Sequence, residues 1–141
     1  MKEAAYHKVK DKSKWGNGPW IDEPDKVQWQ DDNTGLNCIA QRNPDMGHWC
    51  GYVAVPMGHP LYGKSYHDCN ATVHGGPTFS GPGDPNLSWW IGFDCGHAHD
   101  LIPLSLKLGF SLKGQVYRDL AYVKSQCGIL ARQLKALATH N

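Results

Sequence analysis

The feature that most constrains the fold lies near the C-terminus, where apolar residues recur at alternating intervals of four and three. They are Val116, Leu120, Val123, Cys127, Leu130, Leu134 and Leu137. This spacing predicts a single α-helix with one apolar stripe, and Lys124, Arg132 and Lys135 fall on its other faces. A helix with one apolar stripe must pack against another layer, so we expect it to lie across a sheet.

The remainder of the chain predicts strands and turns. Its 16 glycines and nine prolines among 141 residues argue against a helical bundle. Alternating or β-branched runs between turn signals predict strands over residues 27–30, 36–42, 49–55, 70–74 and 89–94. The glycine- and proline-rich residues 75–85 predict a loop, and residues 1–20 an irregular arm.

These elements predict an α+β fold, with one domain over residues 21–141. We expect a mainly antiparallel sheet of about five strands, with the C-terminal amphipathic helix packed on one face. The other face and the long loops would then form a pocket or a contact between subunits.

Charge and cysteine usage restrict the partners and the compartment. A formal net charge of +1 argues against a protein that coats nucleic acid, so we expect no duplex nucleic acid as a partner. The N-terminal residues lack the apolar core of a signal peptide, and no apolar run approaches the length of a membrane span. Five cysteines without a CxxC pair predict a cytoplasmic protein with free thiols.

The first candidate site is a set of possible metal ligands near two predicted strand ends. His74 ends one strand, while Asp94, His97 and Asp100 lie at or beyond the end of another. Imidazole and carboxylate groups bind Zn²⁺ or another divalent metal, and an open coordination position would activate water for hydrolysis. The alternative is that these side chains only bond to loop backbones.

The second candidate site would bind a ligand without reacting. His74, Gly75 and Gly76 would let the backbone approach a phosphate closely. Charge and stacking faces would come from a wider set: Arg42, Lys64 and Arg118, with Trp49, Tyr62, Tyr66, Trp89 and Trp90. Trp89 and Trp90 alternate along a strand and so point to opposite faces, and at least one of them should be core.

Thiol chemistry at Cys95, between Asp94 and His97, is a third possibility. Nothing in the sequence orients a base toward this thiol.

Several segments together resemble a family of small proteins encoded in phage and bacterial genomes. The segments are Glu23-Pro-Asp25, Gly47–Pro56, His59–Tyr66, Val73–Thr78, Trp89–His97 and Tyr117-Arg-Asp, within residues 20–135. The resemblance carries no activity with it. It implies a context of host takeover or immune evasion, and in that family the position of His99 looks like a glycine.

The favoured hypothesis is a non-enzymatic protein that sequesters a small phosphate-bearing nucleotide, as a phage protein acting against an antiviral signal would. Such a protein is expected to be a homo-oligomer in the cytoplasm. The alternatives are a metal-dependent hydrolase or phosphodiesterase using His74, Asp94, His97 and Asp100, and an inhibitor that binds a host protein through exposed tryptophans. The first two hypotheses require His74 and His97 to lie together at one hollow.

Overall fold

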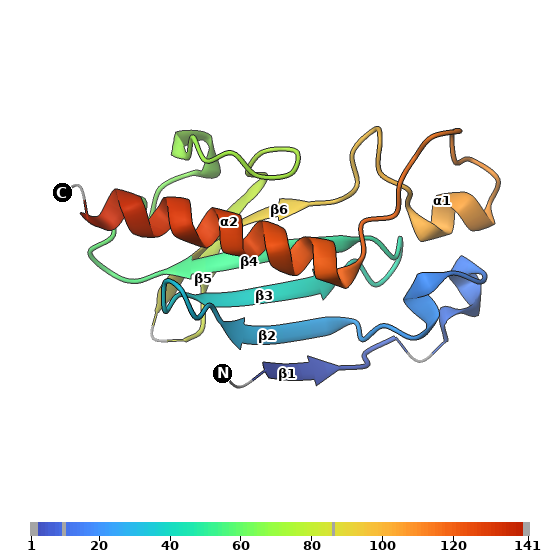
Figure 1. The fold of residues 1–141 in the computed structure, drawn as a ribbon, viewed down its shortest axis with the longest axis horizontal. Coiled ribbons are helices and arrows are strands. Elements are labelled where there is room, and N and C mark those ends of the chain that lie inside the picture. Colours follow the sequence, from blue (N-terminus) through green and yellow to red (C-terminus); the bar gives the residue numbers. More distant parts are fainter. Residues whose placement is uncertain (1–2, 10, 86, 140–141) are drawn as a thin grey trace.

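The computed structural model describes residues 3–9, 11–85 and 87–139, which form a sheet and a long helix packed on it (Figure 1). The strands are β1 (Glu3–Tyr6), β2 (Lys26–Gln30), β3 (Asn37–Arg42), β4 (Trp49–Val55), β5 (Phe79–Gly83) and β6 (Ser88–Asp94). The helices are α1 (Pro103–Lys107) and α2 (Leu120–Thr139), with 3₁₀ turns at Lys12–Trp15, Pro19–Ile21 and Tyr66–Asp68. The six strands found among the described residues pair antiparallel in the order β1-β2-β3-β4-β6-β5. The α+β class and the covering helix are therefore confirmed.

Helix α2 packs its apolar stripe on β3 and β4, as expected. Its residues Val123, Cys127, Leu130 and Leu134 are fully buried. The helix begins at Leu120, four residues later than the stripe suggested, because Val116 instead forms an isolated bridge with Asp100.

A glycine at the centre of β4 lets this helix approach the sheet closely. A Cβ on Gly51 would overlap the ring of Phe93 and would lie 2.8 Å from Sγ of Cys127 on α2. A larger residue at this position would separate the two layers.

The N-terminal segment is more ordered than the sequence suggested. The prediction of an irregular arm over residues 1–20 is wrong for its described part, where β1 forms an edge strand on β2 and two 3₁₀ turns follow. Trp15 and Trp20 are fully buried. The edge strand pairs through its backbone while its side chains are exposed, so it lacks the alternation by which strands are recognised.

Two adjacent segments exchange their predicted roles. Residues 70–74 do not form a strand but run beside α2, where the Gln133 side chain bonds to both backbone groups of Thr72 at 2.8 Å. Within the predicted loop, residues 79–83 form β5 on the outer edge of β6. An edge strand tolerates the proline and glycines of this segment, which argued against a strand in the sequence.

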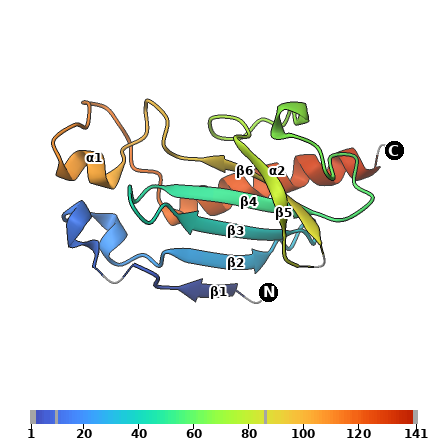
Figure 2. The ribbon, with the colours of Figure 1, turned by 180° about the vertical axis from the view of Figure 1, so that it is seen from behind.

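The two faces of the sheet differ in what covers them. Ala40, Val53, Ile91 and Phe93 lie in the core beneath α2. The opposite face carries Gln28, Ile39, Tyr52 and Trp90, and no helix in the described part of the chain covers it (Figure 2). Trp89 and Trp90 lie on opposite faces, as predicted, with Trp89 against the core and Trp90 on the uncovered face.

Candidate functional site

Five polar side chains from three segments meet beside the N-terminus of α2. We call this group the rim cluster: His74, His97, Asp100, Arg118 and Tyr122. Nε2 of His74 lies 2.9 and 3.0 Å from the two carboxylate oxygens of Asp100, and Nδ1 lies 2.7 Å from the Tyr122 hydroxyl. With Asp100 ionised, Nε2 of His74 donates to the carboxylate and Nδ1 accepts from Tyr122.

Asp100 organises the rim cluster. Its side chain is 1 % exposed and also accepts bonds from Nε of Arg118 and from the backbone N–H of His97, each at 2.9 Å. Burial alone would raise the pKa of this carboxyl group, but the bonds from His74, Arg118 and His97 outweigh it and lower the pKa. The carboxylate is therefore ionised and saturated with donors.

His97 lies beside His74, as both favoured hypotheses required, with 6.0 Å between the ring centroids. Gly75 makes this arrangement possible, because a Cβ at that position would overlap the His97 ring. The backbone of Gly75 also has a φ of +67°, which favours glycine. Nε2 of His97 lies 3.4 Å from Oδ1 of Asp94 but makes no hydrogen bond to any of the described residues. Asp94 itself accepts from the Thr78 hydroxyl at 3.0 Å and from the N–H of Gly96 at 2.9 Å.

The expected metal ligands lie near one another without forming a metal site. Among the described residues, no three His, Cys, Asp or Glu side chains are grouped as the ligands of one ion. His74 and Asp100 are bonded to each other, and Asp94 faces Thr78 and Gly96.

The side chains that complete the cluster could have been found from their spacing on α2. Tyr122 and Gln126 are four residues apart on α2, which places them on one helical face, and Arg118 lies two residues before the helix begins. Gln126 accepts a bond of 2.9 Å from the backbone N–H of His74 and so fixes the loop that carries it.

His48 lies next to the same group, close enough to Asp94, Asp100 and His97 to interact with them. Its Nδ1 is buried and makes no hydrogen bond within the described part of the chain. Burial lowers its pKa, although the nearby carboxylates of Asp94 and Asp100 act in the opposite direction. His48 is thus held neutral beside the rim cluster.

Two expected ligand-binding residues belong to the interior. Arg42 has a fully buried side chain whose guanidinium group lies 5.5 Å from the Trp15 ring centroid and 4.5 Å from that of Trp49. It donates to the Asp25 carboxylate at 3.1 Å and to the carbonyl of Gly47 at 2.7 Å. Arg42 and Trp49 cannot reach a ligand at the surface, and their prediction as ligand-binding residues is wrong.

Three other expected residues form a separate group at the opposite end of β6. Nε1 of Trp89 donates to the carbonyl of Lys64 at 2.9 Å, and the rings of Tyr62 and Trp89 have centroids 6.1 Å apart. Trp89 and Asp94 are five residues apart on β6, or roughly 17 Å along an extended strand. The residues expected at one pocket are therefore dispersed over the molecule, with only His74, Gly75, Gly76 and Arg118 at the rim cluster and Trp90 on the uncovered face of the sheet.

Two further expectations are corrected by burial. The Cys95 side chain is buried and its pKa is raised, first by desolvation and then by Asp100, so it is not an activated thiol. Four of the six tryptophans are buried and the other two, Trp29 and Trp89, are half-buried, so the side chains expected to form an exposed patch are mostly covered.

The cysteines found in the described residues are all free. Within the same residues, no helix combines the length and the hydropathy needed to cross a bilayer.

Comparison of the chain with protein-family models, with curated protein sequences and with solved structures found no match.

Proposed function

We propose that the rim cluster binds the phosphate of a small nucleotide without transforming it. The observation that supports this most is how Arg118 is held. Its Nε donates a hydrogen bond to the buried Asp100. Its two terminal nitrogens form no hydrogen bond with any other described residue, and its side chain is 24 % exposed. A guanidinium group fixed in this way can donate two parallel bonds to a phosphate.

The neighbours of Arg118 suit the rest of such a ligand. Gly75 is exposed and has no side chain to obstruct the approach of a phosphate. The half-exposed His97 offers a flat ring for stacking on a base. These features support a binding site for a nucleotide of modest size, such as the signal of an antiviral system that a phage protein would sequester.

The saturated state of the central groups favours binding over catalysis. Both ring nitrogens of His74 are engaged within the protein, and Asp100 accepts bonds from three donors. A general base needs a nitrogen or oxygen that is free to take a proton from the substrate. Neither residue offers one in this arrangement.

A direct test is a thermal-shift screen with inorganic phosphate, a nucleoside monophosphate, a cyclic dinucleotide and an ADP-ribose derivative. A ligand that binds the folded state raises the melting temperature, and titration calorimetry then gives its Kd. We expect R118Q to raise that Kd roughly tenfold or more, because a charge-assisted bond to phosphate is lost. The exposed Arg132 on α2 provides the matched control, R132Q, which should bind as the unmodified protein does. Equal affinity of R118Q and R132Q would refute the site.

A second function at the same place is favoured by one observation. The order Asp100, His74, Tyr122 is the order in which a carboxylate and an imidazole activate a hydroxyl nucleophile. The phenolic oxygen would attack phosphorus, its proton would pass to Nδ1 of His74, and the bond from phosphorus to the leaving group would break. Water would then hydrolyse the phosphotyrosine.

The pKa of Tyr122 argues against this second function, because burial raises it despite the nearby Arg118. Heating the complex to denature the protein distinguishes the two functions by chromatography of the released ligand. Intact nucleotide supports binding alone. Degraded nucleotide, with turnover abolished by Y122F, would establish hydrolysis instead.

A further inference from the structure

Apolar side chains that face solvent are concentrated in the segment that begins at the end of α1. We call residues 106–116, which run from the end of α1 toward α2, the apolar arm. Of the eleven exposed large hydrophobic residues found in the described chain, five belong to it: Leu106, Leu108, Phe110, Leu112 and Val116. Phe110 is 75 % exposed and Leu112 is 70 % exposed. A concentration of exposed apolar side chains in one segment is typical of an interaction surface.

The apolar arm is held in place by the rest of the chain. The N–H of Val116 donates to the carbonyl of His99 at 3.0 Å, and the Gln115 side chain donates to the carbonyl of Ala98 at 2.9 Å. The N–H of Phe110 donates to the carbonyl of Ser105 at 2.8 Å. Because these bonds already fix the arm, docking would immobilise few additional groups. Association would therefore lose little conformational entropy.

The charge of this region restricts its partner. Residues 101–116 include Lys107 and Lys113 and no acidic residue. A complementary surface would combine an apolar hollow with carboxylates.

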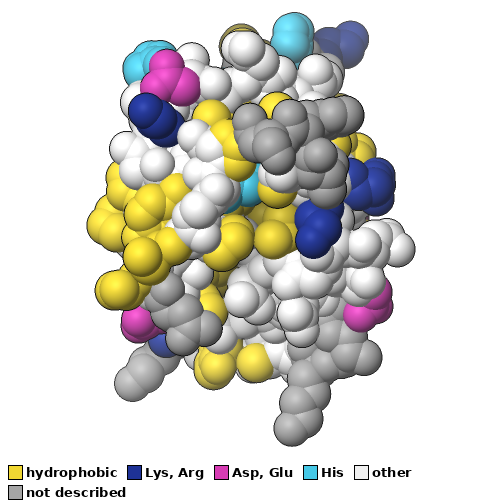
Figure 3. Space-filling model, turned by 90° about the vertical axis from the view of Figure 1, so that its left-hand side faces the viewer, with side chains coloured by type: hydrophobic (Ala, Val, Ile, Leu, Met, Phe, Trp, Pro, Cys, Tyr) yellow, Lys and Arg dark blue, Asp and Glu magenta, His cyan; other side chains and the backbone are white. Residues whose placement is uncertain are grey.

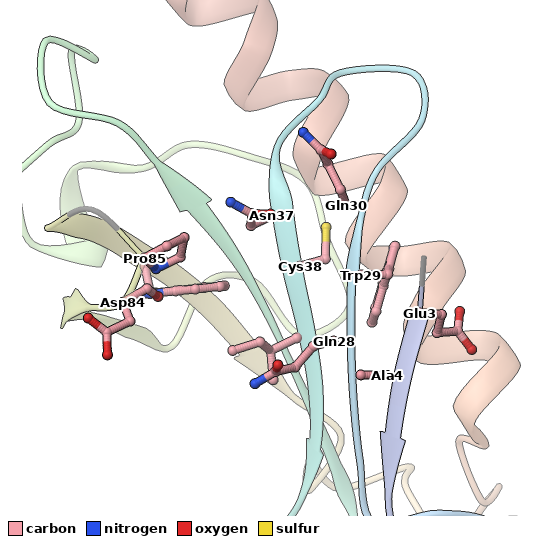
Figure 4. Close-up of a pocket in the computed structure, with 11 residues that line it drawn as sticks. Glu3, Ala4, Gln28, Trp29, Gln30, Asn37, Cys38, Asp84 and Pro85 are labelled. Carbon is pink, nitrogen blue, oxygen red and sulfur yellow. The ribbon is translucent and has the colours of Figure 1, made fainter. Parts of the chain in front are cut away.

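Such a surface exists on this chain, at the end opposite to the apolar arm (Figures 1 and 4). A hollow of about 570 Å³ lies between strands β1 to β3 and the turn at Asp84 and Pro85, and Ile39 and Trp90 contribute to its lining. Figure 3 shows hydrophobic side chains gathered on one side of this end of the molecule. A cavity of roughly 150 Å³ holds a benzene ring, so this hollow is large enough for a phenylalanine side chain and its neighbours.

Carboxylates outnumber cations around the hollow. Glu3 and Asp84 line it, and a second depression that shares Glu3 and Trp29 with it adds Asp31 and Asp32. The cations are Lys124, which pairs with Glu3, and Lys26, which lines a third depression that shares Asp84 and Trp90 with the hollow. This surplus of negative charge complements Lys107 and Lys113.

We infer that the apolar arm of one copy docks in this hollow on a second copy, so that the chain assembles head to tail. The two surfaces lie at opposite ends of the molecule, and a chain therefore cannot fill its own hollow (Figure 1). A head-to-tail contact uses two different surfaces and produces a ring if the rotation closes. This inference does not depend on the nucleotide site.

The test is the sedimentation of the full chain and of two variants. F110S removes an exposed side chain from the arm, and Q28R places a charge in the hollow at a half-buried surface position. We expect the unmodified protein to form a multimer, and each variant to sediment as a monomer that still unfolds in one cooperative transition, at a temperature that no longer rises with protein concentration. Loss of a buried phenylalanine should raise the dissociation constant by roughly 10- to 100-fold.

Mixing the variants tests the geometry of the contact. Q28R retains an intact arm and F110S retains an intact hollow, so an equimolar mixture should give a dimer and nothing larger. Two monomeric variants that remain monomeric when mixed would overturn the inference, because an intact arm and an intact hollow would then fail to pair. An unmodified protein that sediments as a monomer at every concentration tested would also overturn the inference. That conclusion would hold whether or not the protein also sediments with phosphatidylserine vesicles.

Discussion

At the scale of single residues, histidines with very different contacts lie within one small protein. His59 is buried with both nitrogens bonded, to the carbonyl of Leu134 at 2.8 Å and to the N–H of Leu61 at 3.0 Å, which identifies it as a structural residue. His74 is also bonded at both nitrogens but belongs to the rim cluster. His48 and His97 each keep one nitrogen without a hydrogen bond in the described chain. Chain position alone does not distinguish these environments.

His48 should make stability depend on pH. Because burial lowers its pKa below the ordinary value of 6.5, the unfolded chain takes up a proton at a higher pH than the folded chain does. The contribution of His48 is complete above pH 6.5 and is lost as the pH falls from there through the folded-state pKa. Each unit of difference between the pKa values of His48 in the folded and unfolded states corresponds to about 1.4 kcal/mol in the free energy of unfolding.

Urea unfolding between pH 5 and 7.5 measures this effect. H48Q should flatten the fall in stability below pH 6.5, whereas H7Q, at an exposed position, should not. Asp25 and Asp100, whose pKa values are lowered, affect stability in a separate pH range. Their contributions to the free energy of unfolding are present above pH 3.8 and are lost as the pH falls below it. An unchanged slope in H48Q would show that its imidazole is not desolvated in the folded state.

At the scale of elements, α2 and the sheet each contain a glycine, Gly128 in α2 and Gly51 in β4, and only one of these positions has room for a side chain. Gly51 in β4 faces Phe93 and Cys127, where no space remains for a side chain. Gly128 lies within α2, and a Cβ there would first meet Arg132 at 3.8 Å, an ordinary contact. One glycine is required by packing, and the other only reduces the stability of the helix.

Alanine substitutions should therefore change the free energy of unfolding in opposite directions. G51A is expected to reduce it by about 1–3 kcal/mol through overpacking. G128A should increase it by about 0.5–1 kcal/mol, because glycine disfavours the helix. Denaturant titration of both variants checks the pair, and a neutral G51A would mean that α2 does not approach β4 this closely.

At the scale of the whole molecule, Arg42 connects the first quarter of the chain to the sheet and to the segment before α2. Its guanidinium group donates to Glu23 at 3.2 Å, to Asp25 at 3.1 Å and to the Tyr117 hydroxyl at 2.9 Å. Together with the burial of Trp15 and Trp20, these bonds make the N-terminal segment part of the folded unit.

R42K should destabilise the protein by about 3 kcal/mol, because lysine keeps the charge but cannot make the separate bonds of the guanidinium group. Thermal unfolding should remain a single transition at a lower temperature. R132K, at an exposed site, should change stability by less than about 0.5 kcal/mol. A separate early transition in R42K would instead show that the N-terminal segment unfolds independently.

The strands that the sequence predicted correctly share a local signal. β4 matches its predicted range over 49–55, since its residues are apolar or β-branched and are bounded by turns. The edge strands β1 and β5 were missed because one is exposed and the other contains proline and glycine. The proximity of His74 and His97 was expected, although His74 reaches it from an extended segment beside α2 rather than from a strand.

By itself, the sequence determined the α+β class, the central strands and the covering helix, because hydrophobic periodicity is a local property that one segment displays alone. Only the tertiary structure decided which polar residues are interior and which are available to a ligand. Arg42 and Arg118 are the same residue type, yet one lies between tryptophans and the other is partly exposed beside Asp100. That difference arises from partners distant in the chain, whose positions no local pattern contains.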